Sequence, residues 1–423
     1  MGMTFVEKTL ARYAQKDRVV PGEIVIVEPD LYMSHDNTAA IRKIFEKIGV
    51  EKLKYPERAL VVLDHCAPAM TAAYAQNHKE VREFVAQQGI KSFYDINVGI
   101  CHQVMAENGH IVPGRVVVGS DSHTPTSGAF GTLATGIGRT EVAALWATGS
   151  LWFRVPETLK VVVHGKLQDY VYPKDLILKI IGEIRADGAL YRAVEFCGEA
   201  IEHMSISGRM TLCNMTIEMG AKCGYVSPDE KTWKWLEEHG VNRSLAVSND
   251  HLFSDEDAVF ERVLEIDAST LEPQVSCPHT VDNVKPVSAV VGTKIQQAFL
   301  GTCTNGRLDD IAIAAKILEG KKIHSAVRFL VIPASQSVYL EAMDLGFLKT
   351  IIQAGGVVMN SGCGPCMGAY GGIPANGEVC ISTANRNFKG RMGNKESEVY
   401  LASPATVTAA AVAGEIVSSG TQA

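Results

Sequence analysis

Three cysteines in two glycine-rich segments are the residues best suited to chemistry. Cys303 lies in Gly-Thr-Cys-Thr-Asn-Gly-Arg, and Cys363 and Cys366 lie in Ser-Gly-Cys-Gly-Pro-Cys-Met-Gly. Each segment follows a predicted strand, so each is expected to form a turn whose backbone N–H groups face sulfur or an anion. Three thiolates from two loops suit an iron–sulfur cubane with one iron left open, and an open position is what a Lewis-acid catalyst requires.

A Cys-x-x-Cys pair by itself has other interpretations, namely a redox pair, half of a zinc site, or two small buried residues. Zinc would require a fourth ligand, and the sequence has no second Cys-x-x-Cys or paired His at suitable spacing. A zinc-stabilised scaffold is nevertheless kept as an alternative, and metal analysis would distinguish zinc from iron with sulfide. The other seven cysteines are interpreted as small buried residues: Cys66, Cys101, Cys197, Cys213, Cys223, Cys277 and Cys380.

Three histidines lie in short polar motifs: His65 in Leu-Asp-His, His102 in Cys-His-Gln and His123 in Asp-Ser-His. A neighbouring carboxylate raises the pKa of an imidazole and fixes its tautomer, which suits the proton transfer that removal of water requires. Each histidine taken singly is more typical of a hydrogen-bonded structural residue. Asn214 and Glu218 lie four residues apart in a stretch of helical character, so they share a face.

Arginines could hold an anionic substrate, because a guanidinium binds carboxylates in a bidentate manner. Arg386 and Arg391 lie in a loop expected just after a strand. Arg307 and Arg139 are weaker candidates, since either could instead be a structural ion-pair partner.

The elements that must position these residues are short apolar runs that alternate with stretches of helical periodicity. The runs are residues 24–27, 60–63, 116–118, 161–163, 329–332 and 356–359. The helical stretches include residues 174–184 and 311–318. This alternation predicts an α/β fold with mostly buried sheets.

Two composition changes predict domain boundaries. The first is Val-Pro-Glu-Thr at 155–158, and the second is the proline-containing stretch 273–286. We therefore expect three domains, at residues 1–160, 161–283 and 284–423.

Composition excludes several classes of protein. The 423 residues are 46% hydrophobic and 21% charged, with a net charge of -7 and no basic run, which argues against a nucleic-acid partner. No stretch approaches the roughly 18 apolar residues that span a bilayer. The N-terminus lacks the apolar core of a signal peptide, so the sequence predicts a cytoplasmic protein whose ten cysteines are thiols or metal ligands.

Four segments resemble the signatures of the aconitase superfamily, and the likeness extends over essentially the whole chain. They are the two cysteine segments, Asp-Ser-His-Thr at 121–124, and Asn-Arg-Asn-Phe-Lys-Gly-Arg at 385–391. The turn at 304–307 and the chain length are similar to the large subunits of the 3-isopropylmalate dehydratase and homoaconitase group. The resemblance implies three α/β/α domains of the aconitase type around a 4Fe-4S cluster.

The resemblance also implies a partner. Single-chain aconitases continue into a fourth, swivelling domain, which supplies a serine base for the carbon-bound proton. This chain is expected to lack that domain and to act with a separate small subunit of swivelling-domain type.

Residue roles follow from the same resemblance. The cluster ligands are Cys303, Cys363 and Cys366, with the fourth iron open. The implied catalytic residues are Asp64 with His65, Asp121 with His102, and Glu218 with His123. The implied substrate-binding residues are His35, Ser122, Asn214, Asn385, Arg386 and Arg391.

His35 lies where single-chain aconitases typically have Gln, which makes citrate and isocitrate weaker candidates as substrates. The leading hypothesis is a hydro-lyase that isomerises 2- and 3-isopropylmalate through dehydration and rehydration. The alternatives are homoaconitate, 2,3-dimethylmalate or another small hydroxy dicarboxylate or tricarboxylate as substrate, or a non-catalytic RNA-binding relative.

Overall fold

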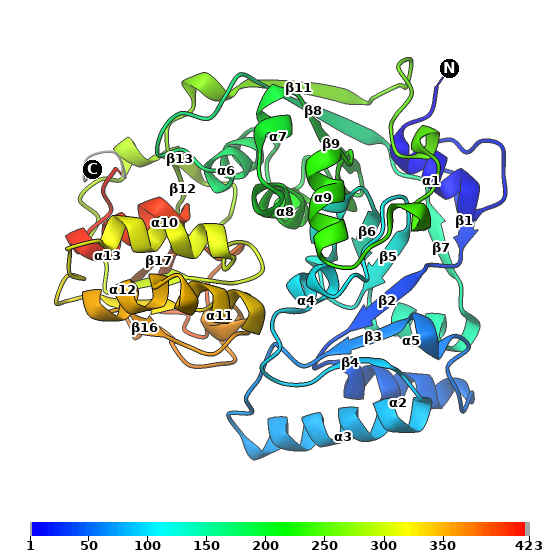
Figure 1. Cartoon of the computed structure of the whole chain (residues 1–423), viewed down its shortest axis with the longest axis horizontal. Helices are drawn as coiled ribbons and strands as arrows, with labels where there is room; N and C mark the ends of the chain where they lie inside the picture. The colour runs from blue at the N-terminus through cyan, green and yellow to red at the C-terminus, as the bar shows by residue number, and fades with distance from the viewer. Residues whose placement is uncertain (1, 419–423) are drawn as a thin grey trace.

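The computed structural model describes residues 2–418 and contains three large sheets, each built from a different stretch of the chain (Figure 1). The first sheet has the strand order β4-β3-β2-β5-β6, and all of its strands are parallel. Its strands are β2 (Leu31–Ser34), β3 (Ala59–Val62), β4 (Ser92–Tyr94), β5 (Val116–Gly119) and β6 (Leu133–Gly136). The helices of this region are α1 (Phe5–Tyr13), α2 (Thr38–Ile48), α3 (Ala72–Gln88), α4 (Cys101–Glu107) and α5 (Arg139–Thr148).

The second sheet is also parallel, with the order β10-β9-β8-β11. Its strands are β8 (Thr158–His164), β9 (Ala193–Cys197), β10 (Cys223–Val226) and β11 (Arg262–Asp267). The accompanying helices are α6 (Pro173–Ile184), α7 (Glu199–His203), α8 (Ile206–Asn214) and α9 (Glu230–Glu238).

The third sheet has seven strands in the order β13-β12-β18-β17-β14-β15-β16, and β12 runs antiparallel to both of its neighbours. The strands are β12 (Gln274–Ser276), β13 (Val284–Pro286), β14 (Gln297–Leu300), β15 (Arg328–Val331), β16 (Val357–Val358), β17 (Val379–Ser382) and β18 (Glu398–Leu401). The helices are α10 (Leu308–Leu318), α11 (Gln336–Asp344), α12 (Phe347–Ala354) and α13 (Pro404–Ala413).

The α/β fold expected from the apolar runs is confirmed. Val-rich runs such as β3 and β5 are buried at every position, because helices and neighbouring elements cover both faces of a parallel sheet. The run at 24–27 is different. It forms β1 (Ile24–Val27), which pairs only with β7 (Leu151–Arg154) in a two-stranded antiparallel ribbon and leaves Ile24 and Ile26 exposed.

The strands of the three large sheets lie within residues 31–136, 158–267 and 274–401. The limit expected at 160 falls inside β8, and the limit expected at 283 separates β12 from β13. We propose limits near 157 and 272, which keep each sheet whole.

One hydrophobic core joins the three sheets and fixes their relative positions. It includes Leu60 of the first sheet, Val161 of the second and Phe299 of the third, each with no exposed surface. Among residues 2–418, the helices are all too short or too polar to cross a bilayer.

Candidate active site

Loops that follow strands of the first and third sheets line one cavity of about 290 Å³. Because parallel strands end at the same edge of a sheet, the loops after β2, β3 and β5 lie together, as do the loops after β14, β16 and β17. The catalytic, substrate-binding and cluster residues implied by the resemblance all line this cavity except Asp64, Asn214 and Glu218. Those three lie behind its wall and hydrogen-bond to residues that line it.

The loop that carries Cys363 and Cys366 reaches the cavity through close backbone contacts. The Cys363 N–H donates to the Asp64 carbonyl over 3.1 Å. Gly364 has φ +58°, and a Cβ there would lie 2.1 Å from Ile332 Cδ1, so a side chain would displace the loop. The glycines around these cysteines therefore allow the loop to pack tightly between the two sheets.

Arg307 holds the loop that carries Cys303. Its guanidinium donates to the Cys303 carbonyl over 2.8 Å, to Ser207 Oγ over 2.7 Å and to Thr211 Oγ1 over 2.6 Å. The side chain is buried with these partners. Arg307 is therefore a structural residue that joins α8 to the cysteine loop, and it does not line the cavity.

The three cysteines form a donor set that fits a metal cluster. Burial raises the pKa of Cys303 to about 12 and raises that of Cys363 further, so the fold itself favours neutral thiols. The sulfurs have weak polar neighbours: Asn385 Nδ2 lies 3.4 Å from Cys303 Sγ, and Arg391 Nη2 lies 3.7 Å from Cys366 Sγ. A bound cation would favour the thiolates, as metal ions do for cysteine ligands.

His65 is held between two carboxylates. Its Nδ1 lies 2.6 Å from Asp64 Oδ1, and its Nε2 lies 3.3 Å from Asp121 Oδ2. Burial opposes a charged imidazole, but the charge of Asp64 and the hydrogen bonds with Asp121 and Asp64 outweigh it. The pKa of His65 is therefore raised well above its usual value, so the fold favours the protonated ring, which faces the cavity.

Asp121 is the centre of this network. His102 Nε2 lies 2.7 Å from its Oδ1, and the His123 backbone N–H donates to the same oxygen over 2.8 Å. Burial acts to raise the pKa of Asp121, but the hydrogen bonds from His102, His123 and His65 lower it well below its usual value. The carboxylate therefore stays ionised between two imidazoles.

Glu218 links a histidine of the first sheet to an arginine of the third. Its Oε1 lies 2.8 Å from His123 Nε2 and accepts from Arg386 Nε over 2.8 Å. Burial acts to raise its pKa, and the hydrogen bond from His123 and the charge of Arg386 together lower it. Glu218 thus orients Arg386 toward the cavity without lining the cavity itself.

Asn214 lies beside both Cys303 and Asn385. Asn214 is fully buried in the segment that leads from α8 to the 3-10 helix η3 (Met215–Met219), and its Oδ1 accepts from Thr304 Oγ1 and Asn385 Nδ2. Asn385 in turn lies beside Cys303 and Cys366. Asn214 therefore supports the residue that lines the cavity.

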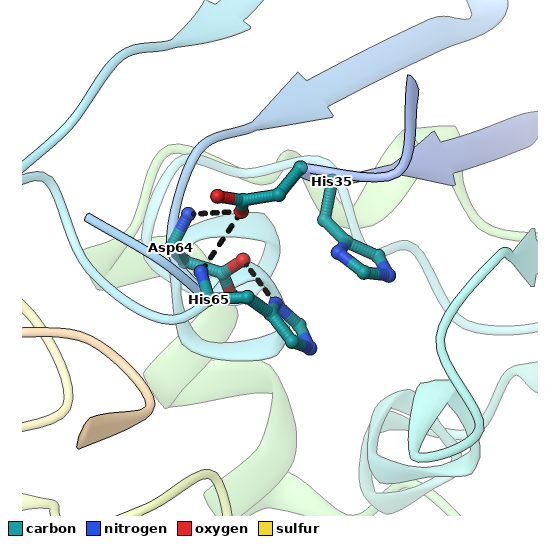
Figure 2. A group of neighbouring side chains, drawn as sticks. His35, Asp64 and His65 are labelled. Carbon is teal, nitrogen blue, oxygen red and sulfur yellow. Dashed lines mark hydrogen bonds and ion pairs between the residues drawn. The ribbon is translucent and has the colours of Figure 1, made fainter. Parts of the chain in front are cut away.

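His35 stacks on His65, with ring centroids 3.9 Å apart and an angle of 20° between the planes (Figure 2). Burial, followed by the charge of His65, lowers the pKa of His35 to about 4, so this ring is neutral where His65 is charged. His35 Nδ1 is buried and lacks a hydrogen-bond partner among residues 2–418.

The group of His35, Asp36, Asp64 and His65 has the composition of a metal site, with ligand atoms within 4.8 Å of one another. Asp36, however, accepts the backbone N–H groups of Asp64 and His65 over 3.0 and 2.9 Å, and its other oxygen lies 3.0 Å from His78 Nε2. Its carboxylate is therefore engaged in shaping the loop after β3.

Sequence reasoning missed Lys174 and Asp36. Lys174 is fully buried at the start of α6, and its Nζ donates to the carbonyls of Thr383 and Ala384 over 2.8 and 2.7 Å. Burial lowers its pKa to about 7. The lysine thereby ties the second sheet's helix to the backbone directly before Asn385. The available signal was a charged pair, Lys174 and Asp175, directly before the apolar run at 176–178.

Comparison with known proteins is consistent with this arrangement. A model of the aconitase family (aconitate hydratase) matches residues 7–294 and 289–414. A probable 3-isopropylmalate dehydratase large subunit of Methanothermobacter thermautotrophicus is 52% identical over 99% of both chains. The 3-isopropylmalate dehydratase large subunit 1 of Methanopyrus kandleri is 50% identical over 98% of both chains. A probable methanogen homoaconitase large subunit of Methanosarcina mazei is 50% identical over 93% of this chain and 98% of that relative. The chain belongs to the aconitase family.

Proposed function

We propose that this chain is the large subunit of a 3-isopropylmalate dehydratase, a hydro-lyase that interconverts 2- and 3-isopropylmalate by removing and re-adding water. The observation that carries the proposal is the convergence of three cysteines and three carboxylate-held histidines on one cavity. Relatives with this name are about half identical to the chain over nearly its full length.

Membership of the aconitase family implies an iron–sulfur cluster, and we propose that it is a 4Fe-4S cluster held by Cys303, Cys363 and Cys366. The fourth iron would supply a Lewis acid that polarises the hydroxyl group of the substrate. The three sulfurs line the same cavity as the histidines. Glycines at the Cys363 loop and Arg307 at the Cys303 loop keep these sulfurs in place.

The chain's own residues move the proton and hold the substrate. His65, kept charged by Asp64 and Asp121, donates a proton from Nε2 to the departing hydroxyl. Arg386 and Arg391 bind carboxylate oxygens, and Glu218 sets the direction of the Arg386 guanidinium. His35, neutral and stacked on His65, lines the wall and presents an imidazole to substrate oxygens.

A separate small subunit completes the enzyme in this proposal. The relatives at about 50% identity are named as large subunits, which supports a partner chain. We propose that the partner is of swivelling-domain type, supplies the base for the carbon-bound proton, and closes the cavity to water. In this proposal, none of the side chains that line the cavity serves as that base.

The test is a substrate panel with cluster-loaded chain and small subunit under anaerobic conditions. We expect turnover of 3-isopropylmalate with the partner and none without it. The panel includes homocitrate and 2,3-dimethylmalate. Full activity of the isolated chain would refute the partner, and failure to convert any hydroxy acid would refute the hydro-lyase assignment.

A homoaconitase is the second candidate. Methanogen homoaconitase large subunits are 48% and 50% identical to the chain, close to the values for the dehydratases. The cavity also has three arginines in its wall, which suits an additional carboxylate. A higher kcat/KM for homoaconitate than for 3-isopropylmalate with the same partner would favour this substrate.

A further inference from the structure

A third arginine, Arg139, lines the cavity from the side of the first sheet. It is the first residue of α5 and follows the turn after β6. β6 lies beside β5 in parallel register, with Gly136 opposite Gly119. The turn that leads to Arg139 therefore lies next to the loop that carries Asp121 and Ser122.

Gly136 permits this close approach. A Cβ at Gly136 would lie 2.8 Å from the Asp121 carbonyl oxygen and 3.1 Å from Ser122 Cα. The Ile137 backbone N–H donates to the Gly119 carbonyl over 2.8 Å. These contacts fix the start of α5 against the site loop, so the position of Arg139 at the cavity is set by backbone packing.

The guanidinium of Arg139 is exposed, and no hydrogen bond or ion pair engages it within the described part of the chain. Glu141, the nearest acid along the helix, is occupied as a cap and accepts the Gly138 N–H over 2.6 Å. Arg307, the other arginine that the sequence left undecided, is buried and hydrogen-bonded to four residues. The two arginines therefore have different roles.

The charge balance of the cavity favours an anion at Arg139. Arg386 has its charge offset by Glu218, with Nε 2.8 and 3.0 Å from the two carboxylate oxygens. Arg391 lies beside the sulfur of Cys366. Asp121 adds a negative charge to the wall. Arg139 has no carboxylate partner among residues 2–418, and a substrate with two or three carboxylates needs more than one positive contact.

We propose that Arg139 is a further substrate-binding residue, whose guanidinium binds a carboxylate of the hydroxy acid from the side formed by β5, β6 and α5. The inference rests on the proposed function and adds a residue to it. Arg386 and Arg391 approach the substrate from the third sheet, and Arg139 approaches from the first. The substrate is thereby held between the two sheets by charges on both.

The test compares Arg139→Gln with Arg139→Lys and with a matched control, Arg262→Gln. Arg262 lies on β11, is exposed, and does not line the cavity, so its replacement makes the same change in net charge elsewhere. Each variant is loaded with cluster, combined with the small subunit, and assayed for KM and kcat with 3-isopropylmalate and homoaconitate. Binding of both ligands is also measured directly by calorimetry.

Loss of a charge-assisted hydrogen bond of this kind weakens binding by about 10- to 100-fold. We expect Arg139→Gln to raise KM and the calorimetric dissociation constant by that factor for one or both ligands, with kcat changed less than KM. Arg139→Lys should recover part of the loss, and Arg262→Gln should match the wild type. Iron and sulfide contents should be equal in all four proteins, because Arg139 contacts no cluster cysteine.

The outcomes separate the two proposals. If the wild type turns over 3-isopropylmalate or homoaconitate and Arg139→Gln has unchanged KM and binding, Arg139 is not a substrate residue and the hydro-lyase assignment stands. If the wild type turns over neither acid, the proposed function fails, and the calorimetric comparison still decides whether Arg139 binds a carboxylate. If Arg139→Gln and Arg262→Gln weakened ligand binding equally, the effect would be due to net charge alone, and the proposal would be overturned.

Discussion

The two sides of the cavity are built in different ways. On the side of the first sheet, His65 Nδ1 lies 2.6 Å from Asp64 Oδ1, and His102 Nε2 lies 2.7 Å from Asp121 Oδ1. On the side of the third sheet, the polar groups beside the sulfurs of Cys303 and Cys366 lie at 3.4 to 3.8 Å. The first side thus has its acid–base geometry organised by the polypeptide, whereas the second presents thiols whose ionisation a cluster would favour.

This difference predicts that the two sides can be damaged separately. Changes on the third-sheet side should remove the cluster and leave the histidine network folded. Changes on the first-sheet side should reduce the chemistry and leave the cluster bound.

Cys363→Ser should abolish cluster binding and activity, because a serine hydroxyl is a poor replacement for a thiolate ligand. Iron and sulfide analysis of anaerobically purified protein, with the visible absorption of the cluster, measures this loss. Cys277→Ser is the control, since Cys277 is buried outside the cavity and should retain the cluster. Equal iron loss in both variants would contradict the ligand assignment.

Asp64→Asn should lower kcat by about 10²- to 10⁴-fold, which is the usual contribution of a general acid. The cluster should stay intact. The amide can still accept the Cys101 N–H that Asp64 Oδ2 accepts over 2.7 Å, but it no longer holds His65 in the charged state. Kinetics of the loaded enzyme, with iron content measured in parallel, test this.

Asp95→Asn is a suitable control because Asp95 is an exposed acid paired with Arg82 outside the cavity. If Asp64→Asn kept a kcat above about half of the wild-type value, Asp64 would have no role in the proposed acid catalysis. Loss of iron from the same variant would show that the two sides are coupled more closely than the geometry indicates.

Lys174→Met should lower the free energy of unfolding by about 2 kcal/mol, because the buried carbonyls of Thr383 and Ala384 lose their donor. Denaturant unfolding of the cluster-free chain measures this effect. Lys179→Met, at a half-buried position on the same helix where the lysine pairs with Glu183, is the control. An unchanged unfolding free energy would mean that α6 does not hold the loop before Asn385.

The smallest effect concerns pH. The pKa of His35 is lowered from 6.5 to about 4, so the folded state favours the neutral ring. Its contribution to stability is complete above pH 6.5 and is lost as pH falls toward 4. Between pH 7.5 and 5.5 the loss should be about 1.4 kcal/mol, the value of one pKa unit.

Comparing wild type with His35→Gln isolates this contribution. The difference in unfolding free energy between the two proteins should change with pH below 6.5 and stay constant above it. The slope should be the same with and without cluster if the first-sheet side is independent of the third. A pH-independent difference would show that His35 is not held neutral by burial.

The sequence carried the local features of the site. The apolar runs predicted the buried strands because residues inside a parallel sheet are covered on both faces, and the prediction held for β3, β5 and β15. The contact between His65 and Asp64 could also be anticipated, since the residues are adjacent. The run at 24–27 predicted a strand correctly. Its composition did not indicate that the strand would lie in a two-stranded ribbon with exposed isoleucines.

Contacts between distant parts of the chain were decided by the tertiary structure. Glu218 meets His123 across 95 residues and Arg386 across 168, and the first of these pairings was expected only from the resemblance to a family. The second carboxylate at His65 and the buried hydrogen bonds of Arg307 had no signal in spacing. Residue types and short motifs set which groups can ionise or bind metal. Which of them meet depends on how the three sheets pack around one core, because that packing brings the ends of strands far apart in the sequence to the same cavity.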